Sequence, residues 1–122
     1  MPQEPRVLAA RPNLEVREVA PLLAFVTAVL GFTTLATMGD GPDFALVERD
    51  GVSLALVASD TPGIPSTTTC YVDVDDVEAM HARCAAKGAD IVAALETHPW
   101  GMRDFVVALP GGHRIAVGQR IS

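Results

Sequence analysis

Apolar and polar residues alternate in short runs along this chain, and two longer stretches space their apolar residues as a helix does. The longer stretches predict one helix that begins after Glu18 and ends at Gly31, and another that begins at Asp75 or Asp76 and ends at Gly88. The alternating runs predict eight strands, at residues 7–16, 32–38, 43–49, 52–59, 67–74, 89–96, 102–109 and 112–119. The order is strand, helix and three strands, twice over.

The segment between the two halves holds two prolines and a glycine, which is typical of a linker. We therefore predict one domain, residues 1–122, made of a first βαβββ module at 7–59, a linker at 60–66 and a second module at 67–119. A chain of 122 residues is long enough for one compact core. The predicted fold class is α+β, with the two repeats forming curved mixed sheets around a shared cleft.

Individual residues of the first half also recur at corresponding positions of the second half. Val16 matches Val74 at an offset of 58 (74 − 16), and Asp43 matches Asp104 at an offset of 61 (104 − 43). Such a small drift indicates two copies of one supersecondary unit with short loop insertions. Two copies that face each other build one cleft, so the residues in that cleft decide the function.

The first predicted helix carries no charged residue between Val19 and Gly31, and its apolar residues cover most of its circumference. A helix that is apolar all round needs burial on more than one side. We therefore expect a homodimer in which this helix lies near the subunit boundary. A helix buried more deeply within its own subunit would show the same pattern.

Charge and composition exclude some partners. The chain has 9 Lys and Arg against 15 Asp and Glu, a formal charge of −6, so it has no basic surface for nucleic acid. The longest apolar stretch, Val19 to Phe32, falls short of the ~20 residues that a membrane span requires. With no secretory leader in the sequence, we expect a soluble, cytoplasmic protein that binds no membrane. Cys70 and Cys84 are expected to be small buried residues rather than a disulfide.

Five motifs in this order resemble those of a known family. They are Ala24-Phe25, Leu30-Gly31-Phe32, Tyr71–Asp76, Pro99–Phe105 and Pro110–His113. Together with the paired βαβββ units they resemble the vicinal-oxygen-chelate superfamily, which includes glyoxalase I, fosfomycin-resistance enzymes, extradiol dioxygenases and the bleomycin-binding resistance proteins. The resemblance covers nearly the whole chain and implies the glyoxalase/bleomycin-resistance fold.

The resemblance also implies where a metal would be bound. Enzymes of the superfamily hold a divalent ion through His or Glu at four strand positions, which match Arg11, Ala55, Thr69 and Ala116 here. The two alanines have no donor atom, Thr69 offers a neutral hydroxyl, and Arg11 repels cations. We therefore expect no metal and no cofactor, as in the bleomycin-resistance-like branch.

Strand alternation predicts which side chains face the cleft, because residues two apart share a face. In the bleomycin-binding proteins a Pro-Trp-Gly segment contributes its ring to the drug groove, so the resemblance implies that Trp100 stacks on a planar ligand. Packing of Trp100 against a dimer partner is the alternative. The predicted ligand-binding residues are Arg11, Asn13, Glu15, Thr69, Tyr71, Trp100, Met102 and Arg114.

The three histidines and one acidic pair suggest no catalytic site. His81 lies beside the buried stripe of the second helix, and His98 lies in a loop with no visible partner, so we expect it to be solvated. The resemblance gives His113 a structural role in its turn. Asp75 and Asp76 are interpreted as a helix cap and a solvated neighbour.

Three functions fit these residues. The first is a metal-free, glyoxalase-like protein that binds a small organic molecule, as in antibiotic resistance by sequestration. The second is a metal-dependent lyase, transferase or dioxygenase of the same superfamily. The third is a structural or regulatory dimer without a ligand.

Overall fold

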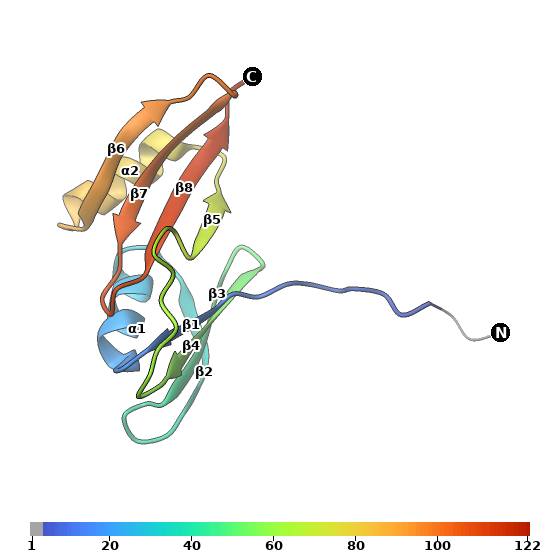
Figure 1. The fold of residues 1–122 in the computed structure, drawn as a ribbon, viewed down its shortest axis with the longest axis vertical. Coiled ribbons are helices and arrows are strands. Elements are labelled where there is room, and N and C mark those ends of the chain that lie inside the picture. The colour runs from blue at the N-terminus through green and yellow to red at the C-terminus, as the bar shows by residue number, and fades with distance from the viewer. Residues whose placement is uncertain (1–3) are drawn as a thin grey trace.

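The computed structural model describes residues 4–122 and contains the two expected βαβββ modules (Figure 1). Module 1 consists of β1 (Asn13–Val16), α1 (Val19–Ala28), β2 (Thr33–Met38), β3 (Phe44–Arg49) and β4 (Val52–Ala58). Module 2 consists of β5 (Cys70–Asp73), α2 (Val77–Ala86), β6 (Asp90–Thr97), β7 (Met102–Ala108) and β8 (Arg114–Arg120). The strand orders are β1-β4-β3-β2 and β5-β8-β7-β6, so the predicted α+β fold and its duplication are confirmed.

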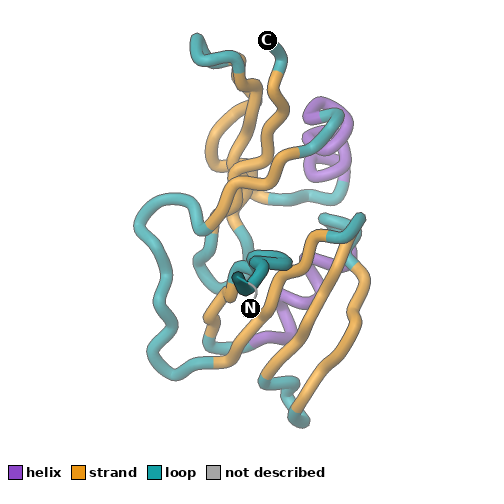
Figure 2. The backbone as a smooth tube through the Cα atoms, turned by 90° about the vertical axis from the view of Figure 1, so that its right-hand side faces the viewer, coloured by secondary structure: helices purple, strands orange, loops and turns teal. Residues whose placement is uncertain are grey.

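The duplication extends to the pairing register. In module 1, β1 pairs in parallel with β4, with Asn13 opposite Ala55. In module 2, β5 pairs in parallel with β8, with Tyr71 opposite Ala116, and these positions are related by the sequence offsets of 58 and 61. Each helix packs on one face of its own sheet, as Figure 2 shows. We call this side of each sheet the helix face and the other side the open face.

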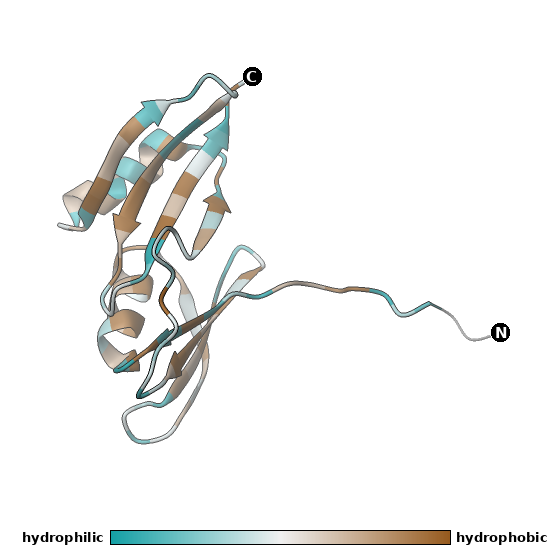
Figure 3. Cartoon of the chain, viewed as in Figure 1, coloured by the Kyte–Doolittle hydropathy of each residue, from teal (hydrophilic) through white to brown (hydrophobic). Residues whose placement is uncertain are grey.

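The buried core lies between each helix and its sheet. In module 1, Leu22 and Val26 of α1 pack with Leu14 and Leu56 of the sheet, and all four are buried. In module 2 the largest fully buried side chain is Phe105. Burying one such side chain stabilises the fold by roughly 1.5–3 kcal/mol. Figure 3 shows the resulting alternation of hydrophobic and hydrophilic residues along the strands of module 2.

Two arginines bind the end of α1 on the helix side, and one of them joins the modules. Arg83 of α2 donates from Nε to the carbonyl O of Val29 at 2.7 Å, and Arg49 donates from Nη1 to the carbonyl O of Leu30 at 2.7 Å. The last carbonyls of a helix have no partner within the helix and carry partial negative charge. Each guanidinium therefore satisfies the end of α1, and Arg83 does so across the module boundary.

The first strand is shorter than predicted. Only Asn13–Val16 form β1, so the prediction of a strand over 7–16 is wrong for residues 7–12, which include Arg11. These residues run as an extended arm away from the modules, and Val7 is 92% exposed (Figure 1). Pro12 lacks the N–H that a ladder needs, which explains why pairing starts after it. The first strand of module 2 likewise begins at Cys70 rather than 67.

The helix ends follow the predicted chemistry with one difference. Asp76, not Asp75, caps α2, because its carboxylate accepts from the backbone N–H of Ala79 at 3.0 Å. Glu18 precedes α1 but its side chain makes no capping bond. Gly31 has φ +77°, which favours glycine, and it lets the N–H of Phe32 bond the carbonyl O of Val26 as α1 ends.

The described residues also bear on the membrane and disulfide expectations. In residues 4–122 no helix has the length and apolar character needed to cross a bilayer. Cys84 is buried, Cys70 is half-buried and both thiols are free. Burial raises the pKa of both thiols, which keeps them protonated and unreactive near neutral pH. The prediction of a buried cysteine is confirmed for Cys84, whereas Cys70 is less buried than expected.

Candidate functional site

The open face of module 2 presents a row of residues that the register places side by side. Tyr71 on β5 lies opposite Ala116 on β8, and Ala116 lies opposite Val106 on β7. The neighbouring row contains Gly118 opposite Asp104. Tyr71, Ala116 and Gly118 therefore share a face, as the alternation of side chains along strands requires.

Four side chains on this face form one connected network. The hydroxyl of Tyr71 donates to Asp104 Oδ2 at 2.9 Å, and His98 Nε2 donates to Asp104 Oδ1 at 2.7 Å. The His98 ring stacks on the indole of Trp100, with ring centroids 4.4 Å apart and an interplanar angle of 5°. We call Tyr71, Asp104, His98 and Trp100 the aromatic network. It joins two predicted ligand residues, Tyr71 and Trp100, through two that were not predicted.

Gly118 allows Tyr71 to lie across the sheet. A Cβ at position 118 would collide with the hydroxyl of Tyr71 and would lie 2.9 Å from Cβ of Asp104. The absent side chain leaves room for the ring to reach the Asp104 carboxylate over β8. Glycine is unfavourable within a strand, but at position 118 it leaves the space in which the phenol of Tyr71 lies.

The environment of Tyr71 keeps its phenol protonated. Desolvation, the hydrogen bond to Asp104 and the negative charges of Asp104 and Asp73 together raise the pKa of Tyr71 to about 12. The hydroxyl proton is committed to Asp104, so the phenol oxygen presents its lone pairs to a bound molecule. The network therefore offers an acceptor oxygen and a stacking surface.

Alkaline titration tests this network directly, because Tyr71 is the only tyrosine of the chain. Absorbance at the phenolate band is expected to show a midpoint near pH 12. The folded pKa lies above the unfolded value, so the stability contributed by Tyr71 is complete below about pH 10 and is lost as pH rises through 12. Asp104→Asn removes the nearby charge and is expected to move the midpoint toward 10, with circular dichroism as the check on folding. An unchanged midpoint in Asp104→Asn would contradict the network.

A second group of predicted residues connects the modules instead of facing a ligand. His113 Nε2 donates to the carbonyl O of Glu15 at 2.7 Å, which leaves Nδ1 to accept from the hydroxyl of Thr69 at 2.6 Å. The carboxylate of Glu15 accepts from the N–H of Gly63 in the linker at 2.7 Å. His113 is buried, which confirms its structural role.

The remaining predicted residues lie apart from the aromatic network. Arg11 is exposed on the N-terminal arm, and Asn13 is exposed on β1. Arg114 donates to the carbonyl O of Ser66 at 2.6 Å and so holds the linker. Met102 begins β7, two residues before Asp104, and by alternation it shares the open face.

Four apolar side chains gather on the open face of module 1, over β2 and β3. Met38 lies opposite Phe44, and Leu46 lies opposite Ala36. Met38 is 63% exposed and Ala36 is exposed, whereas Phe44 and Leu46 are half-buried. Exposed apolar side chains that lie together are typical of surfaces through which proteins bind other molecules.

Comparison with known proteins decides the family. A model of the Glyoxalase/Bleomycin resistance protein/Dioxygenase superfamily matches residues 9–117. The chain belongs to this superfamily. The uncharacterized protein Mb0911c of Mycobacterium bovis is 31% identical over an alignment that covers 93% of this chain and 84% of the relative.

Solved structures of other proteins show the same fold. TioX from Micromonospora sp. ML1 aligns with a TM-score of 0.79 and 24% identity, covering 91% of this chain and 97% of TioX. A glyoxalase/bleomycin resistance protein/dioxygenase from Nocardioides aligns with a TM-score of 0.77 and 21% identity, covering 98% of this chain and 87% of its own. At these identities the likeness concerns the fold alone.

The metal positions that the superfamily implies do not fit a metal here. Ala55 and Ala116 are buried and have no donor atom, and the Thr69 hydroxyl is engaged by His113. The guanidinium of Arg11 carries the wrong charge for a cation ligand. Across residues 4–122 there is no group of three or more His, Cys, Asp or Glu side chains arranged to hold an ion. The chemistry of these donors argues against the superfamily's metal site.

Sequence reasoning missed Asp104 and His98. The expectation that His98 is solvated is wrong, since the side chain is half-buried and paired with Asp104. One signal was present, because Asp104 lies between Met102 and Val106 at the spacing of open-face residues, on a face of the strand that is otherwise apolar. A charged residue on such a face needs a partner, and the adjoining loop provides one in His98.

Proposed function

We propose that this protein binds a small planar organic molecule on the open face of module 2 and acts by sequestration, without a metal. The observation that carries the proposal is the state of Trp100. One face of its indole rests on His98, while the residue as a whole is 68% exposed. A large aromatic ring held in place and left open is a ready stacking surface.

The chemistry around Trp100 defines the ligand class. The Asp104 carboxylate and the acceptor oxygen of Tyr71 favour a ligand that donates hydrogen bonds. The net charge of −6 favours a neutral or cationic molecule over an anionic one. An antibiotic with a flat aromatic part meets these requirements, and binding alone lowers its free concentration in the cytoplasm.

A second copy of the chain completes the site in this proposal. The open face of module 2 carries the aromatic network, and that of module 1 carries the apolar group of Ala36, Met38, Phe44 and Leu46. Stacking module 1 of one protomer over module 2 of its partner covers Met38 and encloses Trp100. The homodimer thus provides the apolar wall that a small-molecule site requires.

Native mass spectrometry of protein purified from its own host tests the proposal. The expected result is one retained organic molecule per subunit, lost in Trp100→Ala and kept in Trp100→Phe, which preserves an aromatic ring. His81→Ala, which alters a histidine outside the network, is the matched control and is expected to keep the ligand. A stoichiometric divalent metal that persists through dialysis would overturn the proposal and favour a metal-dependent enzyme.

A further inference from the structure

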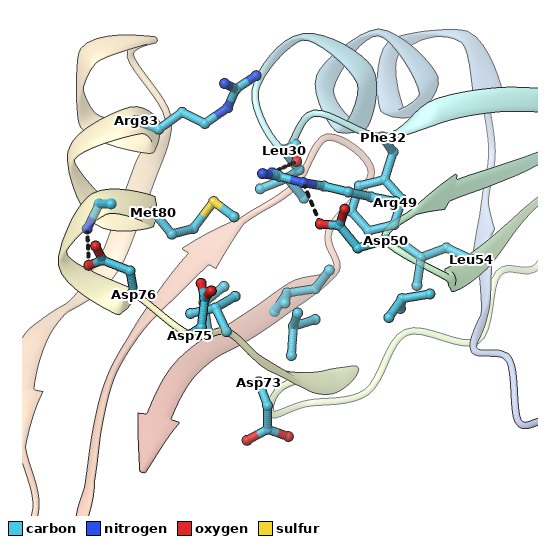
Figure 4. A pocket seen from close by; sticks show the side chains of 16 residues that line it. Leu30, Phe32, Arg49, Asp50, Leu54, Asp73, Asp75, Asp76, Met80 and Arg83 are labelled. Carbon is cyan, nitrogen blue, oxygen red and sulfur yellow. Dashed lines mark hydrogen bonds and ion pairs between the residues drawn. The ribbon is translucent and has the colours of Figure 1, made fainter. Parts of the chain in front are cut away.

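A half-open cavity of about 610 Å³ lies between the helix faces of the two modules, and none of the eight predicted ligand residues lines it. Leu54, Ile115 and Val117 are buried and form its apolar floor, while Phe32 and Met80 line its walls (Figure 4). Cavities of roughly 300–1,000 Å³ with apolar linings are typical of small-molecule sites. This one lies on the opposite side of the sheets from the aromatic network.

The duplication explains why the cavity is open. Where the turn before β8 meets β1, His113 bonds the carbonyl O of Glu15, and a Cβ at Gly111 would come within 3.1 Å of Cβ of Val16. At the related junction, the turn before β4 lines the cavity, and Val52 takes the position of His113 (113 − 61). Val52 is 48% exposed and has no polar group to reach across. The second junction therefore stays unfilled.

The linker adds to this difference between the two junctions. At the closed junction, Pro62 and Ile64 of the linker lie beside Pro21 of α1 and line a smaller groove of about 330 Å³. A chain with two modules has only one linker, so the related groove has no such cover. The cavity thus remains because the single linker between the two modules covers only one of the two related junctions.

The two cationic side chains at the cavity are already engaged. Arg49 bonds the carbonyl O of Leu30, and its Nε lies 3.3 Å from Oδ2 of Asp50. Arg83 bonds the carbonyl O of Val29. These guanidinium groups are held by the end of α1, and Figure 4 shows Arg49 with both of its partners.

The acidic side chains at the cavity outnumber the basic ones. Three aspartates, Asp50, Asp75 and Asp76, line it with their side chains against two guanidinium groups, while the carboxylate of Asp73 points away from it (Figure 4). Asp76 caps α2, whereas Asp75 has no hydrogen bond or ion pair among residues 4–122. The rim therefore has an excess of negative charge above an apolar floor.

We propose that this cavity is a second binding site, which takes a hydrophobic amine. The apolar or aromatic body of the molecule packs on Leu54 and Ile115, and the ammonium group lies at the rim near Asp50 and Asp75. Phe32 and Met80 suit such a body, because an aromatic face and a thioether both accommodate cationic aromatic molecules. The site is independent of the one proposed on the open face of module 2.

Methyl NMR of methionine-labelled protein tests the site with naphthylethylamine as the probe. Met80 lines this cavity and Met102 lies on the open face, so their methyl signals report the two sites separately. The expected result is a saturable shift of the Met80 signal. The probe naphthylpropionate carries a carboxylate in place of the ammonium group. Its affinity, measured from the same Met80 signal, is expected to be at least tenfold weaker.

A matched pair of double variants tests the role of charge. Asp50→Asn with Asp75→Asn is expected to lower the affinity for naphthylethylamine about tenfold, as loss of two partly exposed ion pairs allows. Asp60→Asn with Asp90→Asn makes the same change of net charge outside the cavity and is expected to change affinity less than twofold. Equal shifts of Met80 by both probes, or a Met80 signal that does not move, would overturn the proposal. A probe that shifted only the Met102 signal would also overturn this proposal, but it would not contradict the site proposed on the open face of module 2.

Discussion

Replacing His113 with alanine is expected to lower the free energy of unfolding by about 3 kcal/mol. The imidazole is 1% exposed and bonds both the Thr69 hydroxyl and the carbonyl O of Glu15. The substitution leaves both partly buried partners without this hydrogen bond and also opens a cavity. Urea unfolding followed by circular dichroism measures the change, and the midpoint of thermal unfolding should fall by about 10 °C.

His81 provides the control for this prediction. It is half-buried and packs edge-on against Phe105, with ring centroids 5.0 Å apart, but it forms no hydrogen bond in the described structure, residues 4–122. His81→Ala is therefore expected to cost about 1 kcal/mol, the value of one aromatic contact. If both variants lost equal stability, the bridge between the modules would not be the source of the effect of His113.

The elements and the pairing register were predictable because the two halves of the sequence repeat the same pattern. Tyr71 opposite Ala116 repeats Asn13 opposite Ala55, so one alignment of the halves fixes both sheets. Strand alternation then places Tyr71 and Gly118 on one face without knowledge of any loop. The Asp50-Gly51 turn was also evident, and both residues have the positive φ that such a hairpin requires.

The aromatic network was not predictable, since it depends on a loop conformation. His98 and Asp104 are six residues apart on two sides of a hairpin, and the Trp100 ring reaches His98 only because the loop folds back. Gly101 has φ +88°, and this left-handed residue allows the fold-back. Periodicity carries no information about such a segment. The same reason hid the engagement of Thr69 by His113, which joins residues 44 positions apart.

The two halves have also diverged in ways that only the packing reveals. His113 and Val52 occupy related turns, yet one is buried between the modules and the other is exposed at a cavity. Sequence comparison of the halves shows the substitution but not its result. Whether a turn closes on its neighbour depends on the reach of one side chain and on the path of the single linker.

Replacing Met38 with glutamate is expected to convert the proposed homodimer into a monomer. Met38 lies in the apolar group on the open face of module 1 and is mostly exposed in the single chain, so the change leaves the fold intact. In the dimer it would bury an unpaired carboxylate, and two-fold symmetry would do so twice. We expect the dissociation constant to rise at least a hundredfold, measured by sedimentation over a concentration series.

The control is Ala82→Glu, which adds the same charge on the exposed side of α2, away from the open faces. This variant is expected to keep the dissociation constant of the original chain within about threefold, since a solvated surface charge is screened. A monomeric original chain at micromolar concentration would contradict the homodimer. A Met38→Glu variant that remains dimeric would instead place the interface elsewhere, and α1, whose exposed positions are Ala20, Pro21, Ala24 and Ala28, would then be the next surface to alter.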